Sequence, residues 1–152
     1  MRRQTNLAEA DGRGEALLLT GVPGLDDVLC GGLAANRLYL LEGVPGAGKT
    51  TVALQFLRDG AARGEAVLYI TLSESTRELE GVARSHGWDL AGIQVHELLP
   101  SSEAFEPDEQ YTMFHPSEVE LTETLKKVLT EVARIKPTLV VFDSLSELRL
   151  MA

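Results

Sequence analysis

Apolar residues along this chain fall into short continuous runs, and these alternate with longer stretches in which apolar residues recur at helical spacing. A strand that is buried on both faces is apolar throughout, as a parallel sheet covered by helices requires. The continuous runs therefore predict four strands: RLYLLEG (37–43), AVLYIT (66–71), a shorter IQVHEL (93–98) and TLVVFDS (138–144).

The stretches between these runs predict helices, because their apolar residues return to one helix face. Ser75 and Glu78 have the spacing of a capping box, and Gly87 closes the helix that they open. Ser117 and Glu120 repeat this spacing before the last helix. The predicted helices are KTTVALQFLRDGAA (49–62), STRELEGVARSH (75–86) and EVELTETLKKVLTEVARI (118–135). Strands and helices that alternate in this way predict an α/β domain, with a mostly parallel sheet flanked by helices.

Two segments lack a periodic pattern. Residues 1–15 are polar and predict a flexible N-terminal tail, which leaves residues 16–152 as one domain or a large part of one. Residues 100–116 contain three prolines and several acids, and predict a long irregular connection. Between tail and first strand, TGVPGLDDVLCGGL (20–33) predicts a short helical turn held between two tight turns.

Charge and composition argue against some classes of function. The net charge is −9 at pH 7, which argues against a general affinity for nucleic acid, because such binding depends on lysines and arginines that neutralise phosphates. The single Cys30 cannot form an internal disulfide, as is typical of a reducing cytosol. No apolar run approaches the roughly 18–20 residues that span a bilayer. We therefore predict a cytoplasmic protein without a membrane segment.

The clearest chemical signal is a glycine-rich loop between a predicted strand and a predicted helix. Gly43, Gly48, Lys49 and Thr50 satisfy the pattern G-x-x-x-x-G-K-[ST] in the strand-to-helix context that this pattern requires. Glycines let several backbone N–H groups turn toward one point, and the helix N-terminus adds about half a positive charge. Lys49 can reach the outer phosphates of a polyphosphate, and the Thr50 hydroxyl can bind Mg²⁺.

A second signal is Asp143, an acid at the end of the apolar run 138–144. In an open parallel sheet, the carboxyl ends of the strands face the crevice where ligands bind. A carboxylate there can hold Mg²⁺ through a water molecule and complete a nucleotide site. Taken alone, an acid in this place is more often a helix cap. Together with the glycine-rich loop, it predicts a magnesium ligand.

Several segments together resemble the RecA-like P-loop ATPases, in particular the KaiC and RadA branch. They are TGVPGLDDVLCGGL before the loop, GVPGAGKTT as Walker A, YITLSES as the acidic strand end, HGWDL after the next helix, and LVVFDSLSEL as Walker B. The resemblance runs from about Thr20 to the last residue. It implies ATP as ligand, Mg²⁺ as cofactor, and a homo-oligomeric ring or filament with nucleotide at the subunit interfaces.

The resemblance also assigns roles to residues of this chain. Lys49 is a candidate for catalysis as well as for binding, and Thr50 and Asp143 are the candidates for holding the metal. The candidates for binding the nucleotide are Gly43, Val44, Pro45, Gly46, Ala47, Gly48, Lys49, Thr50 and Thr51.

Three departures from the family pattern bear on these roles. Asn36 stands where the family has a glycine, which is tolerable because asparagine adopts left-handed conformations more easily than most residues. Ser73 and Glu74 stand where the family usually has two glutamates, the first of which activates the attacking water. Serine cannot act as that base at neutral pH. Glu74 remains a catalytic candidate, and a role as a strand-end cap stays equally open, so we expect hydrolysis to be slow, unusual or absent.

The third departure is length. The family's domain continues with further strands and helices, including the strand that lies between the Walker A and Walker B strands. We therefore expect an N-terminal portion of such a domain, truncated at its C-terminus.

Four readings of the function follow. The leading one is a Mg-ATP-binding ATPase that acts as a nucleotide-dependent switch in signalling or assembly, with a protein as partner. A sensor that binds ATP with vestigial hydrolysis is the main alternative. A small-molecule kinase fits less well, because the chain has no arginine cluster to screen phosphate charge. Part of a DNA-dependent RecA/RadA recombinase is the fourth.

Overall fold

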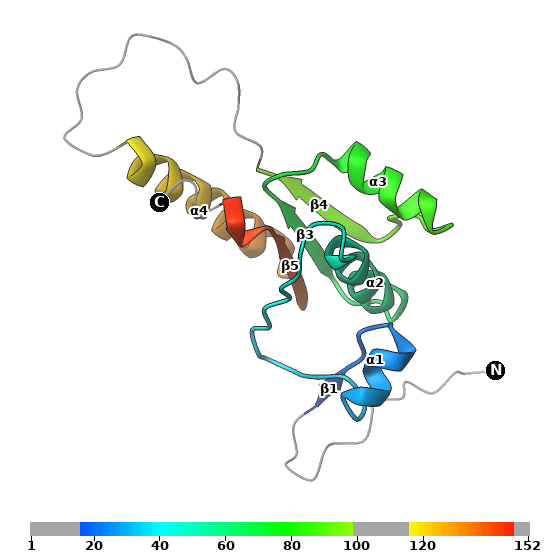
Figure 1. Ribbon diagram of the computed structural model, residues 1–152. Helices are drawn as coiled ribbons and strands as arrows, with labels where there is room; N and C mark the ends of the chain where they lie inside the picture. The colour runs from blue at the N-terminus through cyan, green and yellow to red at the C-terminus, as the bar shows by residue number, and fades with distance from the viewer. Residues whose placement is uncertain (1–15, 99–115, 148–152) are drawn as a thin grey trace. The chain divides into compact units, whose positions relative to one another are not determined.

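The computed structural model describes residues 16–98 and 116–147, and within helix α4 it places the side chains only from residue 122 onward (Figure 1). The described chain falls into two compact units that divide after Asp59. The predicted tail, residues 1–15, and most of the predicted connection, residues 100–116, lie outside the described residues.

The first unit begins with two short strands that the sequence did not predict. Strands β1 (Leu17–Leu18) and β2 (Leu33–Ala34) pair in antiparallel orientation. Between them lies the predicted helical turn, α1 (Pro23–Val28), whose first residue is a proline. Thr20 donates to Asp26 Oδ1 from its backbone N–H and from its hydroxyl, both at 2.7 Å. These bonds fix the entry to α1, since Asp26 lies in its first turn.

The predicted strand 37–43 is wrong. These residues have no regular secondary structure, and the apolar side chains at 38, 40 and 41 are exposed, Leu38 to 98%. Within the described residues this segment pairs with no strand. A continuous apolar run becomes a buried strand only when neighbours bind its backbone and cover its faces, so the run alone does not form the element.

Helix α2 (Lys49–Ala62) has the bounds that the sequence predicts. Leu54 and Leu57 on it are fully buried. Its last three residues, from Gly60 on, belong to the second unit. Gly60 is buried there against Leu139 and Val67, so closely that a Cβ at this position would collide with the Leu139 side chain.

The second unit is a three-stranded parallel sheet of order β4-β3-β5, and it confirms the other three predicted strands. The strands are β3 (Val67–Thr71), β4 (Ile93–Glu97) and β5 (Leu139–Asp143). All five residues of the central strand β3 are buried, which explains why its sequence is apolar without alternation. The register aligns Val67 with Ile93 and Leu139, so the three strands end together.

Helices α3 (Thr76–Ser85) and α4 (Pro116–Ile135) cover opposite faces of this sheet. Alternate residues of a strand point to opposite faces, and the even-numbered residues face α4. On that face α4 contributes Val128, Val132 and Ile135 to a cluster with Leu68, Ile70, Leu72, Leu98 and Phe142. On the odd-numbered face, Ala83 of α3 lies near Ile93 and Val95 of β4. Figure 1 shows α3 beside β4 and α4 beside β5.

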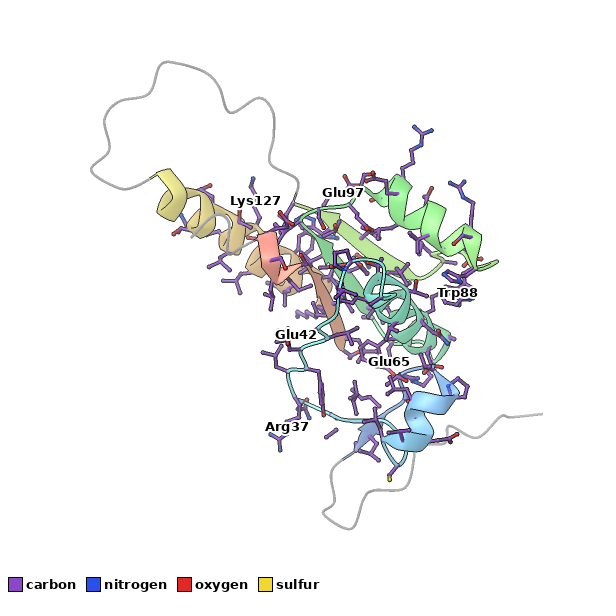
Figure 2. All side chains as sticks on the ribbon, viewed as in Figure 1. Arg37, Glu42, Glu65, Trp88, Glu97 and Lys127 are labelled. Atoms are coloured by element: carbon purple, nitrogen blue, oxygen red, sulfur yellow. The ribbon has the colours of Figure 1, made fainter. Side chains whose placement is uncertain are left out.

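The ends of these helices test the predicted caps. Ser75 and Glu78 form the predicted capping box of α3, and Gly87 follows its end with a φ of +70°. Glu97, labelled in Figure 2 near the start of α3, also accepts a 2.6 Å hydrogen bond from the Thr76 N–H. Helix α4 differs from the prediction, since it begins at Pro116 and so includes Ser117 in its first turn. Proline favours the first helical position because its missing N–H would have no partner there.

None of the helices in the described part of the chain is both long and apolar enough to cross a membrane.

Candidate functional site

The glycine-rich loop, residues 43–48, lies in the first unit and leads directly into α2. Gly46 and Gly48 adopt φ values of +80° and +85°, which side-chain-bearing residues rarely tolerate. The Ala47 N–H donates to Val44 O at 3.1 Å and closes a turn inside the loop. The chain therefore needs its glycines at these two positions to turn tightly enough for the helix to start at Lys49.

Lys49 folds back over this loop. Its Nζ donates to Gly43 O at 2.9 Å and to Val44 O at 3.1 Å. The loop itself is exposed, with Val44 74% accessible. In these two contacts the positive charge of the ammonium meets neutral carbonyl oxygens of the exposed loop. An anion whose oxygens occupied this place would accept charge-assisted hydrogen bonds from Lys49. These bonds would replace the two bonds to the loop carbonyls.

Thr50 and Thr51 follow in the first turn of α2, and both are half-buried. The first N–H groups of a helix lack intrahelical acceptors and carry the positive end of the helix dipole. Residues 43–51, which the sequence proposes as the nucleotide-binding segment, thus form one continuous anion-compatible structure. Their chemistry suits phosphate oxygens, and the Thr50 hydroxyl is a hard oxygen ligand of the kind Mg²⁺ prefers.

Asp143 lies in the second unit, at the carboxyl end of β5 and opposite Thr71 of β3. Its backbone carbonyl accepts a 2.9 Å hydrogen bond from the Leu72 N–H. Its side chain accepts a 2.6 Å hydrogen bond at Oδ2 from the hydroxyl of Tyr69. Backbone and carboxylate of Asp143 are therefore both anchored to β3.

Glu74 lies beside Asp143, in the turn that follows β3. The Thr71 hydroxyl fixes this turn, since it accepts from the Glu74 N–H at 3.0 Å and donates to Glu74 O at 2.8 Å. Burial, then the charge of Asp143 and then that of Glu78, raise the pKa of Glu74 above its ordinary value of 4.5. Glu74 Oε2 is buried and has no hydrogen-bond partner among the described residues. Ser73, by contrast, is exposed.

These two carboxylates fit a hard divalent cation. A buried oxygen without a partner and the repulsion between Glu74 and Asp143 are both relieved by a positive charge between or beside them. Among the described residues, no three His, Cys, Asp or Glu side chains gather as a metal cage. Mg²⁺ needs no such cage, because it is usually held by one or two carboxylates together with substrate phosphates and water. The residues present therefore fit Mg²⁺.

The structure thus forms two groups of predicted site residues. Residues 43–51 are assembled in the first unit, whereas Asp143 and Glu74 are assembled in the second. The sequence did not predict the contact between Tyr69 and Asp143. Strand alternation was the available signal. It places residues 69 and 71 on one face of β3, and Asp143 on the same face of the neighbouring strand β5.

A groove of about 480 Å³ lies elsewhere in the second unit, between α3 and β4. Trp88, labelled in Figure 2, lines it with Ala83 and Ile93, and Glu80, Arg84 and Asp89 add charges. None of the predicted site residues lines this groove.

Comparison with known proteins identifies related sequences. A family model described as "ATPase: KaiC" matches residues 18–152. A UPF0273 protein of Aeropyrum pernix is 31% identical over 139 residues, which cover 86% of this chain and 55% of that protein. A UPF0273 protein of Pyrobaculum aerophilum is 32% identical over 137 residues, 85% of this chain and 48% of that protein. The circadian clock oscillator protein KaiC of Prochlorococcus marinus is 33% identical over 129 residues, 84% of this chain and 25% of that protein. The chain spans about half the length of the two UPF0273 relatives.

Proposed function

The chain belongs to the KaiC ATPase family, whose members bind nucleotides, and on that premise we propose that it binds Mg-ATP and acts as a nucleotide-dependent switch. One observation carries the proposal: Lys49 Nζ lies over the turned glycine loop at the N-terminus of α2. This arrangement offers a cation, backbone N–H groups and a helix dipole to one anion. These groups suit the phosphates of ATP, and the acids of the second unit suit Mg²⁺.

Each residue has a proposed part in that binding. Residues 43–51 surround the phosphates, and the ammonium of Lys49 exchanges its two loop carbonyls for the outer phosphate oxygens. Thr50 and Asp143 hold Mg²⁺, which when bound neutralises phosphate charge. Their hydroxyl and carboxylate oxygens are ligands of the class that Mg²⁺ selects.

We propose slow hydrolysis as the second activity of this site. Glu74 is the candidate base, because its buried Oε2 has no hydrogen-bond partner among the described residues. Its raised pKa also makes the carboxylate a better proton acceptor. The position before it is Ser73, which is exposed and cannot take a proton at neutral pH. Turnover below that of an enzyme with a positioned glutamate is the expected result.

Binding is tested by titrating a fluorescent ATP analogue with Mg²⁺ into the wild-type chain and Lys49→Ala. Loss of a hydrogen bond to a charged group costs roughly 1.5–3 kcal/mol, so we expect the variant to bind at least about 10-fold more weakly. Lys126→Ala is the matched control, because Lys126 is an exposed lysine of α4 that pairs with Glu123. Equal affinity of Lys49→Ala and wild type would refute the assignment of the loop.

A sensor that binds ATP without turning it over is the second candidate, and the exposed Ser73 favours it. Ser73→Glu and Glu74→Gln distinguish the two readings in a phosphate-release assay. A Glu74-dependent ATPase loses its activity in Glu74→Gln. A binding-only sensor shows no release to lose, and gains release in Ser73→Glu.

Assembly and partners belong to the same proposal. We infer a cytoplasmic homo-oligomer, ring or filament, whose nucleotide state changes its contacts with a protein partner. The net charge of −9 supports a protein partner over nucleic acid. A recombinase-like role predicts instead that single-stranded DNA stimulates phosphate release, which makes that assay the test between the two.

A further inference from the structure

We propose that Tyr69 is a positioning residue for the Mg²⁺ of the nucleotide site, because its hydroxyl holds the Asp143 carboxylate in the orientation that receives the ion. This inference rests on the proposed function, since it concerns the same metal. It adds a residue that lies outside the glycine loop and outside the acidic strand ends.

The geometry of the sheet makes Tyr69 suited to this part. In the parallel register Tyr69 lies opposite Val141, and Asp143 is two residues further along β5. Two residues of a strand span about 6.5 Å, a distance that only a long side chain crosses. The Tyr69 ring is fully buried, and its hydroxyl reaches Asp143 Oδ2 at 2.6 Å. The packed ring therefore gives the hydroxyl a fixed place.

The hydrogen bond from Tyr69 also matters because a second carboxylate lies near Asp143. Glu74 lies close enough to Asp143 for the two negative charges to repel each other. A hydroxyl that donates to a carboxylate stabilises its charged form and restricts its rotation. A carboxylate has about four acceptor positions on two oxygens, so one donated bond orients the group without using all of its binding capacity. Tyr69 thus holds the Asp143 carboxylate in one orientation beside a second acid.

The alternative is that Tyr69 only fills the core and that its hydroxyl takes the nearest acceptor, as buried tyrosines usually must. The two readings differ in what happens to Mg²⁺. A core-filling tyrosine affects folding alone, whereas a positioning tyrosine also affects the ion through Asp143. Groups that orient metal ligands typically change metal affinity about 10- to 100-fold when they are removed.

The test is a double-mutant cycle of Tyr69→Phe, Asp143→Asn and the pair, read as the Mg²⁺ concentration that half-saturates binding of a fluorescent ATP analogue. Phenylalanine keeps the ring and removes only the hydroxyl. We expect Tyr69→Phe to raise the half-saturating Mg²⁺ concentration about 10-fold or more. We expect no further change when it is added to Asp143→Asn, because Tyr69 acts through that carboxylate.

Tyr39→Phe is the matched control, since the Tyr39 hydroxyl donates to a backbone carbonyl, Ala34 O, in the other unit. Its Mg²⁺ requirement should equal that of wild type. Tyr69→Phe with an unchanged Mg²⁺ requirement, while Asp143→Asn raises it, overturns the inference and leaves the proposed function standing. A wild-type chain that does not bind the analogue at any Mg²⁺ concentration overturns the proposed function, and the inference with it.

A measurement on the wild type covers the case in which Tyr69→Phe does not fold. A hydroxyl proton in so short a bond to a carboxylate should give a resolved NMR signal, assigned through its contacts to the Tyr69 ring. The signal should shift when Mg²⁺ is added to the nucleotide-loaded chain. A signal that stays in place on this addition counts against the positioning role.

Discussion

Close packing of the end of α2, from Gly60 on, against the sheet of the same unit predicts different effects for the same substitution at two helical glycines. Gly60 near the end of α2 lies against Leu139 and Val67, and a Cβ there would collide with the Leu139 side chain. Leu139 is only 4% exposed, so its side chain has little space to move away. At Gly81 of α3, an added Cβ would meet open space, with nothing within 4 Å. Gly60→Ala should therefore overpack the sheet, whereas Gly81→Ala should not.

The magnitudes follow from two effects. Alanine is favoured over glycine in a helix by about 0.8–1 kcal/mol, and both variants gain this. An added carbon in a well-packed core typically costs about 1–3 kcal/mol, and this cost applies to Gly60→Ala alone. Gly81→Ala should thus raise the free energy of unfolding by roughly 0.5–1 kcal/mol. The free energy of unfolding of Gly60→Ala should be lower than that of Gly81→Ala by about 1–3 kcal/mol.

The assay is urea denaturation followed by circular dichroism, with wild type, both variants and the double variant. The transition slope should stay the same in all four proteins, so that midpoint changes report stability. The two substituted positions share no contact, so their changes in the free energy of unfolding should add in the double variant. If Gly60→Ala is as stable as Gly81→Ala, the end of α2 does not pack on β5 as described, and the reasoning fails.

Two further predictions concern the turn after β3. Ser75→Ala removes the side-chain acceptor of the capping box and should lower the free energy of unfolding by about 1 kcal/mol, as measured by urea denaturation. The comparison is Ser85→Ala at the other end of α3, where the Ser85 hydroxyl donates to Val82 O. An equal loss of stability in Ser85→Ala would argue against a specific cap at Ser75. Glu74→Gln tests the raised pKa of Glu74: a raised folded-state pKa means that stability is present below the ordinary value of 4.5 and is lost as pH rises through the folded-state value. The variant should therefore exceed wild type in stability at pH 7 in EDTA and match it below pH 4.5, and a constant difference across this range would contradict the assignment.

The second unit was predictable from sequence because its signals are local or periodic. The run at 66–71 is apolar throughout, and the strand it predicts is the central strand, buried on both faces. The capping box at Ser75 and Glu78 involves residues three apart, so sequence spacing alone defines it. In the first unit the same holds for Asn36, whose φ of +56° is the left-handed conformation that asparagine was expected to accept.

Other features could not be predicted because they depend on partners distant in sequence. The segment 37–43 has the composition of a buried strand, yet whether it forms one is decided by whether neighbouring strands are present to pair with it. The short strands β1 and β2 pair over only two residues each, too few for a period to show. The contact between Tyr69 and Asp143 joins residues 74 apart in the chain. Alternation gives the shared face, but only the sheet order makes these two strands neighbours.

Each of the two units presents a charged group that lacks an oppositely charged partner among the described residues. In the first unit, the positive charge of Lys49 is directed at two neutral carbonyls of its own loop. In the second, Glu74 and Asp143 repel each other, and a buried oxygen of Glu74 has no described partner. Phosphate oxygens would improve the arrangement in the first unit, and a divalent cation would relieve the repulsion in the second. The proposed ligand, Mg-ATP, contains both a polyphosphate and a divalent cation, so each arrangement by itself is compatible with one part of that ligand.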